Sequence, residues 1–593
     1  MADYIHVSVA WPYVNGDLHA GHIAGSNLPA DIFARYHRLK GNHVLKVSGS
    51  DTHGTPIMVE ADAQGIPPRE LFERFHKRHL DVLQRLGLSF NLHTHTDTEN
   101  HHQIAQDIFK ILLDREYLYR ETQQRLFSLT ENRFLEDRYV EGTCPVCKFE
   151  GARGDQCDNC GSLLNATELI NPRAKSDGST PILRETEHYF LDLEAFREPL
   201  AAYMEKHQHH WRETVYSESY GKVHEQRGRP ITRDVNWGIP VPLDDPAWAD
   251  KRLYVWFEAV MGYFTASIEW SKNNGNPDAW KRWWYNPEAR VYNFLGKDNI
   301  IFHTIIWPAE LLGFSGLYND GDKTPINLPY DVPANQYLNL EERKLSKSRK
   351  WLIPMPDLLD GFDPDAVRYY LTAIMPETRD ADWKWDDFIA RNNNELLAKW
   401  GNLVNRVLKF AYKHWEGVVP DPGTLRPMDE ELIATIEAGF ASVGERLEAV
   451  KLRDALAEAM RLATEVNIYL DNAPWFGATI KEDKPSAATT IYTALRCIDN
   501  LKILFAPFLP FSSEKVQHYL GYDEPLFGSL SIQTFQEETR SHEALVYDES
   551  HATGRWEPSQ LRAGQTLREP EALIRKLDAD YVQEQRVKMG LVV

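Results

Sequence analysis

Residues 4–22, YIHVSVAWPYVNGDLHAGH, contain the pattern on which the rest of the chain depends. Residues 4–10 alternate apolar and polar side chains, which is typical of a strand, and residues 15–17 supply a turn. His19-Ala20-Gly21-His22 follows, and apolar residues then recur at helical spacing up to Leu39. The sequence therefore predicts a strand that leads into a helix with two histidines in its first turn. At this place in a parallel sheet, the free N–H groups of the helix bind nucleotide phosphates.

The HxGH motif alone does not decide the function. His19 and His22 are suited to donating hydrogen bonds to phosphate oxygens, and Gly21 between them lets a nucleotide base approach the backbone. A pair of surface histidines at a helix start would give the same pattern.

The next segment repeats the alternation of strand and helix. Residues 44–48 predict a second strand, which ends in the glycine-punctuated loop 49–56, and helices are predicted at 56–63 and 68–86. This alternation indicates an α/β fold, in which helices cover a Rossmann-type parallel sheet. The carboxylate of Asp51 in the loop suits a cationic group such as an ammonium, but a cap for the following helix explains it equally well.

Composition sets the broad class. The chain has 593 residues, enough for about three or four domains. Acidic residues exceed basic ones by 87 − 66 = 21, which argues against a protein that coats nucleic acid non-specifically. We find no apolar run of the roughly 20 residues that span a bilayer and no secretory signal, so we expect a cytoplasmic enzyme without membrane contact.

Two histidine pairs, His93 with His95 and His101 with His102, look like possible metal ligands. No cysteine or carboxylate accompanies them at convincing spacing. We therefore predict solvated loop and helix-cap residues.

Four of the five cysteines form a stronger metal motif. Cys144, Cys147, Cys157 and Cys160 make a CxxC-x9-CxxC pattern with glycines nearby. In a chain without a secretion signal, this pattern predicts a tetrahedral four-thiolate Zn²⁺ site. Since no ligand position stays open, the metal is expected to be structural. Disulfides are disfavoured in a reducing compartment, and the duplication disfavours a redox pair. Cys497 lies in an apolar helical pattern and is expected to be buried.

The α/β pattern returns after about residue 233. Residues 253–257 and 290–295 predict strands, and the second strand runs into Gly296-Lys297-Asp298. His303 and Trp307 then lie four apart on one helical face. Such a face is either plain core or the wall of an apolar side-chain pocket, to which Trp256 and Tyr263 would contribute.

Residues 343–350, RKLSKSRK, are strongly basic in an otherwise acidic chain. A basic loop that carries serines indicates a bound anion, such as a triphosphate or an RNA backbone. A solvated run of charge is the alternative.

Two motifs taken together resemble those of class I aminoacyl-tRNA synthetases. His19-Ala20-Gly21-His22 is similar to their HIGH motif, and Lys344-Leu345-Ser346-Lys347-Ser348, about 320 residues later, is similar to their KMSKS motif. Within this class the chain resembles the methionyl-tRNA synthetases most. The matching segments are residues 10–16, 49–56, 254–256, 262–263, 296–298, 302–303 and 307–308, together with the inserted cysteine motif.

The resemblance implies two steps: ATP and methionine give methionyl-adenylate and pyrophosphate, and the methionyl group then moves to the terminal ribose of tRNA(Met). The implied catalytic residues are His19, His22, Lys344 and Lys347. Mg²⁺ would accompany the ATP, whose implied contacts are His19, Gly21, His22, Asp298, Lys344, Ser346, Lys347 and Ser348. The implied methionine site consists of Asp51 for the ammonium group and a thioether pocket of Ala10, Tyr13, Trp256, Ala259, Tyr263, His303 and Trp307.

After residues 365–370 the sequence is helical to about residue 520. Asn402, Arg406 and Trp475 resemble the residues with which this family reads the anticodon, and such side chains suit unstacked bases. Without the resemblance, all three would be assigned to helix packing. No appended dimerisation module is seen, so a monomer is expected.

The expected division of the chain follows the motifs. It comprises a catalytic first half (1–117), an insertion with the zinc knuckle (118–232), a catalytic second half (233–325), a KxSKS junction (326–385), an all-α anticodon-binding domain (386–540) and a C-terminal tail (541–593).

The sequence departs from the family pattern at four positions. Trp11 stands where leucine is common, and Val260 where proline is common; both fall in the implied pocket. Leu345 replaces the methionine of KMSKS, and Lys350 replaces a glycine.

Other classes of function fit the sequence less well. Leucyl, isoleucyl and valyl enzymes usually carry a far larger insertion, and a cysteinyl enzyme needs metal ligands beside the substrate. A nucleotidylyltransferase needs no anticodon reader. A non-catalytic tRNA-binding paralogue has no use for His19, His22, Lys344 and Lys347 together.

Overall fold

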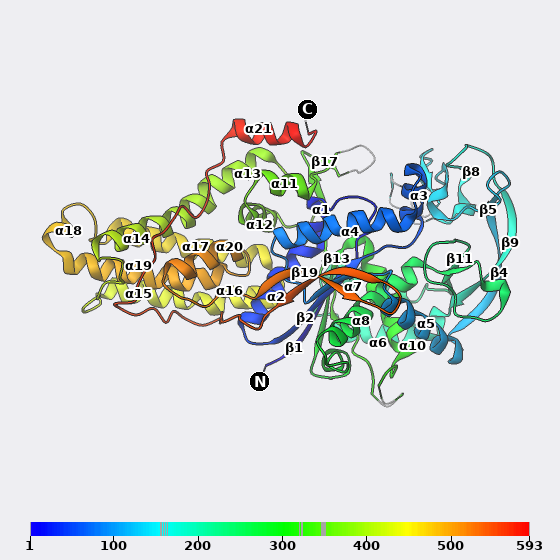
Figure 1. Cartoon of the computed structure of the whole chain (residues 1–593), viewed down its shortest axis with the longest axis horizontal. Coiled ribbons are helices and arrows are strands. Elements are labelled where there is room, and N and C mark those ends of the chain that lie inside the picture. The colour runs from blue at the N-terminus through cyan, green and yellow to red at the C-terminus, as the bar shows by residue number, and fades with distance from the viewer. Residues whose placement is uncertain are drawn as a thin grey trace.

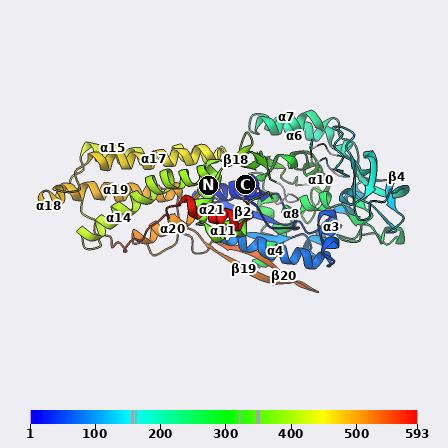
Figure 2. The same ribbon diagram turned by 90° about the horizontal axis from the view of Figure 1, so that it is seen from above.

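The computed structural model describes residues 2–154, 157, 159, 160, 162, 164–319, 321, 324–345 and 351–591. The molecule is elongated: the central sheet has the zinc-motif insertion on one side and a helical bundle on the other (Figures 1 and 2). Among the described residues, none of the helices combines the length and the apolar character needed to cross a bilayer.

The first predicted strand forms the middle of the central sheet. β1 (Tyr4–Val9) lies between β13 (Arg290–Gly296) and β2 (His43–Ser50) and is parallel to both. Beyond them, β3 (Leu92–His95) is parallel to β2, and β14 (Pro329–Asp331) is parallel to β13. The order along the sheet is β14-β13-β1-β2-β3-β20-β19. The predicted Rossmann-type parallel sheet is confirmed.

Helices follow the strands as the alternation predicts. α1 (Ala20–His22) and α2 (Leu28–Leu39) follow β1, and α3 (Thr55–Gln64) and α4 (Pro68–Arg85) follow β2. The remaining helices of the catalytic part are α5 (Glu99–Asp114), α8 (Val255–Asn273), α9 (Lys281–Trp284), α10 (Trp307–Phe314), α11 (Met355–Gly361), α12 (Pro364–Ala373) and α13 (Trp385–Arg391). A short strand and a small sheet accompany them. β15 (Ala334–Asn335) pairs with β13, and β16 (Leu338–Leu340) lies between β17 (Arg343–Lys344) and β18 (Ala381–Trp383) in a three-stranded sheet.

The strand predicted at residues 253–257 is wrong. The structure has only β12 (Arg252–Leu253) there, and α8 begins at Val255. The run of apolar and aromatic residues fits a buried strand and a buried helix equally well. Most residues of α8 are buried, and a buried helix can be apolar on nearly all of its sides. The apolar run is therefore compatible with a helix as well as with a strand.

The insertion is built on a long antiparallel ribbon of β4 (Leu118–Ser128) and β9 (Ile182–Leu191). A second small sheet, with β6 (Val140–Thr143) between β7 (Ala152–Arg153) and β8 (Ile170–Ala174), supports the cysteine motif. The other elements are β5 (Arg133–Phe134), α6 (Arg197–His207), α7 (Glu213–Val223), β10 (Arg229–Pro230) and β11 (Thr232–Arg233).

The helical bundle contains the elements α14 (Asn402–His414), α15 (Pro427–Glu437), α16 (Gly439–Glu448), α17 (Leu452–Asn472), α18 (Thr479–Glu482), α19 (Lys484–Phe505) and α20 (Pro510–Tyr519). Cys497 is fully buried in α19, as predicted. The last helix, α21 (Ala579–Lys588), contacts α11 and α13.

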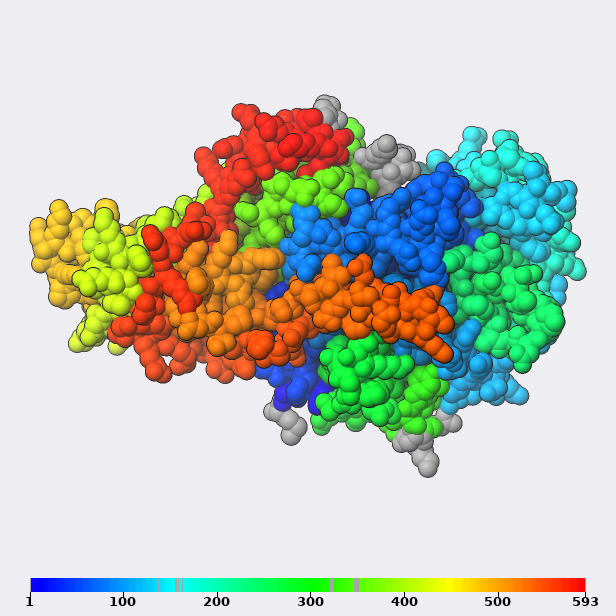
Figure 3. All heavy atoms as spheres, in the orientation of Figure 1, coloured from blue at the N-terminus to red at the C-terminus, as the bar shows by residue number. Residues whose placement is uncertain are grey.

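A β-hairpin crosses the expected boundary between helical domain and tail. β19 (Ser529–Gln536) and β20 (Ser541–Asp548) pair with each other, and β20 runs antiparallel to β3 at Leu545 and His93. The expected boundary at 540/541 falls in the turn of this hairpin, so neither an all-α segment to 540 nor a separate tail from 541 describes the chain. Figure 3 shows the hairpin on the surface between the two halves of the catalytic part.

Candidate active site

The HxGH turn is held in a defined geometry by its own backbone. His19 is the N-cap of α1, and its Nδ1 accepts a hydrogen bond from the N–H of Gly21 at 3.1 Å. The Nδ1 of His22 accepts from the N–H of His19 at 3.2 Å, and the two rings stack with centroids 3.7 Å apart. Because both Nδ1 atoms accept, each neutral ring carries its proton on Nε2. The Nε2–H group of each ring is therefore the one suited to donate a hydrogen bond.

The second signature segment meets the first in space. The N–H of Ala20 donates to the carbonyl of Ile353 at 3.1 Å, and the N–H of Met355 donates to the carbonyl of Leu18 at 2.9 Å. On the other side of the basic loop, a β-carbon at Gly21 would lie 2.9 Å from Cδ1 of Leu345. The loop that joins Leu345 to Ile353 thus begins and ends beside the HxGH turn.

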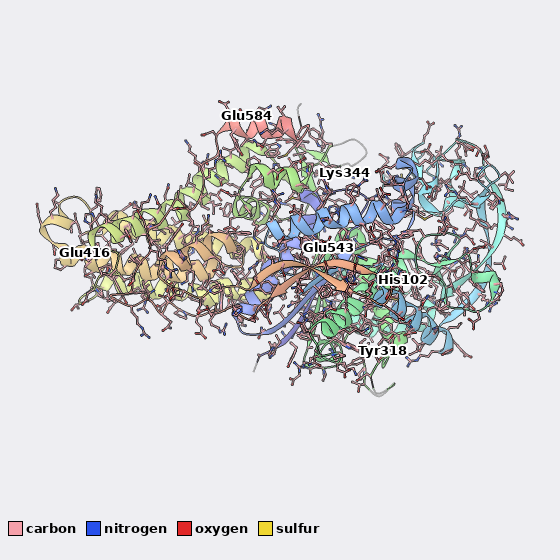
Figure 4. All side chains as sticks on the ribbon, viewed as in Figure 1. His102, Tyr318, Lys344, Glu416, Glu543 and Glu584 are labelled. Atoms are coloured by element: carbon pink, nitrogen blue, oxygen red, sulfur yellow. The ribbon has the colours of Figure 1, made fainter. Side chains whose placement is uncertain are left out.

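The basic side chains of this loop are described only in part. Lys344 is exposed on β17 (Figure 4). Ser346, Lys347, Ser348 and Lys350 lie outside the described residues.

Asp298 lies at the same edge of the sheet, one turn beyond the end of β13. Its carboxylate is exposed. Burial of the Tyr337 hydroxyl, together with this carboxylate, raises the pKa of Tyr337. Lys297 beside it forms an ion pair with Asp380 at 2.9 Å.

The loop that carries Asp51 runs beside the segment after β1. The N–H of Asp51 donates to the carbonyl of Pro12 at 3.0 Å, and the N–H of Val14 donates to the carbonyl of Asp51 at 3.1 Å. Asp51 does not cap α3: the N-cap is Gly54, which makes no side-chain cap bond. Burial, together with the nearby Glu258, raises the pKa of Asp51 well above its usual value. This carboxylate therefore stands where a cation would be favoured.

Several residues of the expected thioether pocket are in contact with one another. The hydroxyl of Tyr263 lies 2.7 Å from Nε2 of His303, and the Tyr263 ring lies 6.2 Å from that of Trp307. Nδ1 of His303 donates to the carbonyl of Asn299 at 2.9 Å, so Nε2 accepts from the tyrosine. Burial lowers the pKa of His303 to about 4, so the imidazole is neutral.

The other expected pocket residues lie closer to solvent. The rings of Tyr13 and Trp256 are 6.4 Å apart, and Ala10 and Ala259 are half-buried like them. Ala10 is fixed by a bond from its N–H to the carbonyl of Phe294 at 3.0 Å, at the end of β13.

The four cysteines have the geometry of a metal site. Their Sγ atoms all lie within 4.8 Å of one another, with Cys144 and Cys160 3.9 Å apart and Cys147 and Cys157 3.6 Å apart. Tetrahedral thiolates at a metal–sulfur distance of about 2.3 Å are about 3.8 Å apart, which matches. A disulfide requires sulfurs about 2.05 Å apart, which does not. The cluster can hold a metal ion.

In the helical bundle, the structure brings two of the three expected tRNA contacts together. Asn402 and Arg406 are exposed on α14, and the Arg406 guanidinium lies 5.7 Å from the Trp475 ring centroid. Trp475 itself is buried, and its N–H donates to the carbonyl of Leu470 at 2.8 Å. The next residue, Phe476, is 69% exposed. Phe476 therefore presents an exposed aromatic ring next to Trp475, and it is not among the tRNA contacts predicted from the sequence.

Comparison with known proteins agrees with this arrangement. The family model for tRNA synthetases class I (M) matches residues 5–408, and that for the anticodon binding domain of methionyl tRNA ligase matches residues 419–591. The curated methionine–tRNA ligase of Thermomicrobium roseum is 51% identical, with 99% of each chain covered. The chain belongs to the methionine–tRNA ligase family.

Two further proteins are similar to this synthetase-family chain over their whole length. The methionine–tRNA ligase of Chloroflexus aggregans is 50% identical, with 99% of each chain covered. The crystal structure of Mycobacterium tuberculosis methionyl-tRNA synthetase bound by methionyl-adenylate has the same fold, with a TM-score of 0.74 and 23% identity over 96% of this chain and 100% of that one.

Trp11, a departure from the family pattern, has glycines on two sides. β-Carbons at Gly49 and Gly262 would lie 2.3 and 2.7 Å from its indole ring. The large ring thus fits because both facing residues lack side chains. Val260 is buried in the core next to the pocket.

A buried polar network behind Asp51 escaped the sequence analysis. His93, His95 and His101 are buried, so the prediction of solvated histidines is wrong for them. Glu258 accepts from Nδ1 of His53 at 2.8 Å and from Nε2 of His101 at 2.8 Å. Asp97 faces His53 at 3.6 Å and His102 at 3.2 Å. The local sequence feature that pointed to this network is that His53 follows Asp51 by two residues.

Proposed function

We propose that the chain ligates methionine to tRNA in two steps. Methionine and ATP form methionyl-adenylate and pyrophosphate, and the methionyl group is then transferred to the 3′-terminal ribose of tRNA(Met). The observation that carries the proposal is the meeting of the HxGH turn with both ends of the basic loop, together with the buried carboxylate of Asp51 and the contacts of Tyr263 with His303 and Trp307. A carboxylate for the ammonium group and an apolar wall for the thioether suit methionine.

In this proposal catalysis consists of positioning and charge stabilisation. His19 and His22 donate hydrogen bonds to the α-phosphate side of ATP as the carboxylate of methionine attacks. Lys344, Lys347, Ser346 and Ser348 hold the departing pyrophosphate. Gly21 and Asp298 contact the nucleoside, and Mg²⁺, which neutralises the phosphates when bound, accompanies the ATP.

The amino acid is held by two different kinds of contact. Asp51 binds its ammonium group, while Ala10, Tyr13, Trp256, Ala259, Tyr263, His303 and Trp307 surround the side chain. The neutral His303 matters here, because a charged imidazole would be a poor neighbour for a thioether.

Asn402, Arg406 and Trp475 are proposed to read the anticodon. The exposed polar side chains of α14 suit base edges, and the indole beside Arg406 suits stacking if it turns outward. We expect Trp475→Ala to weaken tRNA charging while leaving amino-acid activation unchanged. Equal losses in both steps would contradict anticodon reading.

The metal of the cysteine cluster is proposed to be one structural Zn²⁺, because four thiolates fill its coordination shell. The site lies in the insertion, apart from Asp51 and the HxGH turn. The chain is further proposed to act as a cytoplasmic monomer; the return of α21 onto α11 and α13 of the same chain is consistent with this.

Amino-acid-dependent exchange of pyrophosphate into ATP, run separately with each standard amino acid, tests the proposal. We expect exchange with methionine alone. Exchange with another amino acid would keep the synthetase reaction but show that Trp11 and Val260 reshape the pocket. Tight tRNA binding without any exchange would show a non-catalytic paralogue.

A further inference from the structure

The turn of the β19–β20 hairpin is hydrogen-bonded to the N-terminus of α5. Glu537 accepts hydrogen bonds from the N–H groups of Glu99 and Asn100 at 2.7 and 3.4 Å. In return, the carboxylate of Glu99 accepts from the N–H groups of Glu538 and Thr539 at 2.8 and 3.0 Å. A carboxylate at a helix N-terminus is favoured by the helix dipole. The hairpin therefore fixes the segment that carries His101 and His102.

Arg540 connects the hairpin to the buried polar network behind Asp51. Its Nη1 donates to Oδ2 of Asp97 at 3.1 Å, and Nη1 of Arg69 lies 2.6 Å from the same oxygen. Asp97 is buried, and its other oxygen, Oδ1, faces Nε2 of His53 at 3.6 Å and Nε2 of His102 at 3.2 Å. Figure 4 shows His102 near the turn of the hairpin and Glu543 farther along it. Asp97 thus links the hairpin to His53.

His53 completes the connection to the loop of Asp51. Its Nδ1 lies 2.8 Å from Glu258, and its backbone N–H donates to the carboxylate of Asp51 at 3.4 Å. The imidazole lies between the carboxylates of Asp97 and Glu258. These contacts fix the loop that carries Asp51 at His53, two residues after Asp51. Losing one of the two carboxylate contacts would let this loop move.

We propose that Arg540 is a positioning residue for the ammonium group of methionine, acting through Asp97 and His53 on Asp51. The inference rests on the proposed role of Asp51 in binding that group. It gives the hairpin, which lies more than 430 residues along the chain from Asp97, a part in substrate affinity. The Tyr263–His303 hydrogen bond of the expected thioether pocket involves neither Asp97 nor His53, so we expect Arg540 to affect the ammonium group more than the side chain of the substrate.

Two competitive inhibitors that differ only in the ammonium group test the inference. Methioninol carries the group, and 4-(methylthio)butan-1-ol lacks it. Their inhibition constants are measured by pyrophosphate exchange with the full chain. We expect Arg540→Gln to weaken methioninol about 5- to 20-fold, the scale of one charged hydrogen bond felt through an intermediate group. The binding of 4-(methylthio)butan-1-ol should change by less than about twofold.

Two variants make the result specific. Arg540→Lys keeps the positive charge near Asp97 and should restore most of the methioninol affinity. Glu543→Gln alters a charge on the same hairpin; among the described residues its recorded ion pair is with Lys77 at 4.0 Å, and the change should leave both inhibitors unchanged. If Arg540→Gln fails to fold, the Arg540→Ala and Asp97→Asn variants are compared in the same way.

The outcomes separate this inference from the proposed function. Equal weakening of both inhibitors, or of neither, in a folded Arg540→Gln variant would overturn the positioning role. Asp51→Asn serves as the reference. If it leaves the preference for methioninol unchanged, the ammonium site itself is wrong; if it abolishes the preference while Arg540→Gln does not alter it, only the role of Arg540 is wrong.

Discussion

Two buried clusters differ in their balance of charge. Three cations contact the single carboxylate of Asp31, whereas three carboxylates, including that of Asp51, lie around His53. Lys46, Arg35 and Arg368 contact Asp31 at 3.0, 2.9 and 2.9 Å, and Ser89 adds two hydrogen bonds. Asp51, Glu258 and Asp97 instead surround His53, with Arg69 and Arg540 at the far side of Asp97. Both clusters are buried beside the same sheet.

The electrostatics of the two carboxylates differ accordingly. Burial alone would raise the pKa of Asp31, but its three cations hold it well below the usual value. Burial and Glu258 instead raise the pKa of Asp51 well above it. The first cluster is complete within the chain, and Arg368 also donates to the carbonyls of Pro507 and Phe508, which ties the sheet to the helical bundle. In the second cluster no Lys or Arg contact to the Asp51 carboxylate is recorded among the described residues, which is why we propose that Asp51 binds the ammonium group of the substrate.

The largest effect is expected from Asp31→Ala. Removing the carboxylate leaves Lys46 and Arg368 buried without their counter-charge, which costs about 3–5 kcal/mol of unfolding free energy. Urea unfolding measures the loss. Asp81→Ala, which removes one of the two exposed partners of Arg85, is the matched control and should cost less than about 1 kcal/mol. Similar losses in both variants would remove the distinction between the clusters.

Asp51→Asn should have the opposite profile. Methionine activation should fall roughly 100-fold, the scale of a lost charged hydrogen bond to the ammonium group. The unfolding free energy should stay unchanged or rise, because the wild-type carboxylate is destabilised by burial and by Glu258. Exchange kinetics and urea unfolding of one preparation check both statements. A clear loss of stability would place Asp51 with the structural cluster.

The pH dependence of stability should carry the signature of His53. Burial alone would lower its pKa, but Glu258 and Asp97 raise it to about 10. Since the unfolded value is about 6.5, its contribution is complete below pH 6.5 and is lost as the pH rises toward 10. The ring faces the titratable groups Glu258, Asp97 and His102 and the indole of Trp237, and Asp51 accepts from the backbone N–H of His53.

Comparison of the wild type with His53→Gln isolates this contribution. The difference in unfolding free energy between the two proteins should be largest near pH 6 and should shrink steadily toward pH 10. Urea unfolding at several pH values measures it. A difference that stays constant over this range would mean that His53 is neutral in the folded protein.

The contrast between the clusters also explains what the sequence could reveal. The strand at residues 4–9, the helices 55–64 and 68–85 and the cysteine motif follow from local periodicity and spacing, and each was predicted. His53 meets Glu258 across 205 positions and Arg540 meets Asp97 across 443, and no local pattern encodes such contacts. Asp51 could be singled out because it lies in a loop at a strand end, whereas His101 and His102 were predicted to be solvated.

The hairpin shows the same limit. Leu530 and Ile532 alternate with polar residues, which is a readable strand pattern. That β20 pairs with β3, and so brings the hairpin to the edge of the nucleotide-binding sheet, depends on a surface formed by the first hundred residues.

The smallest effect is expected from His102→Asn on metal content. His53, Asp97 and His102 are close enough together to suggest a second metal site. However, Arg69 and Arg540 occupy one oxygen of Asp97, and a protonated His53 has no lone pair to offer. Elemental analysis of freshly purified protein should therefore give one zinc per chain in both the wild type and His102→Asn, while Cys157→Ser should lose it. Two metals in the wild type and one in His102→Asn would show instead that the cluster behind Asp51 binds a metal ion, and Arg540 would then orient a ligand of that ion.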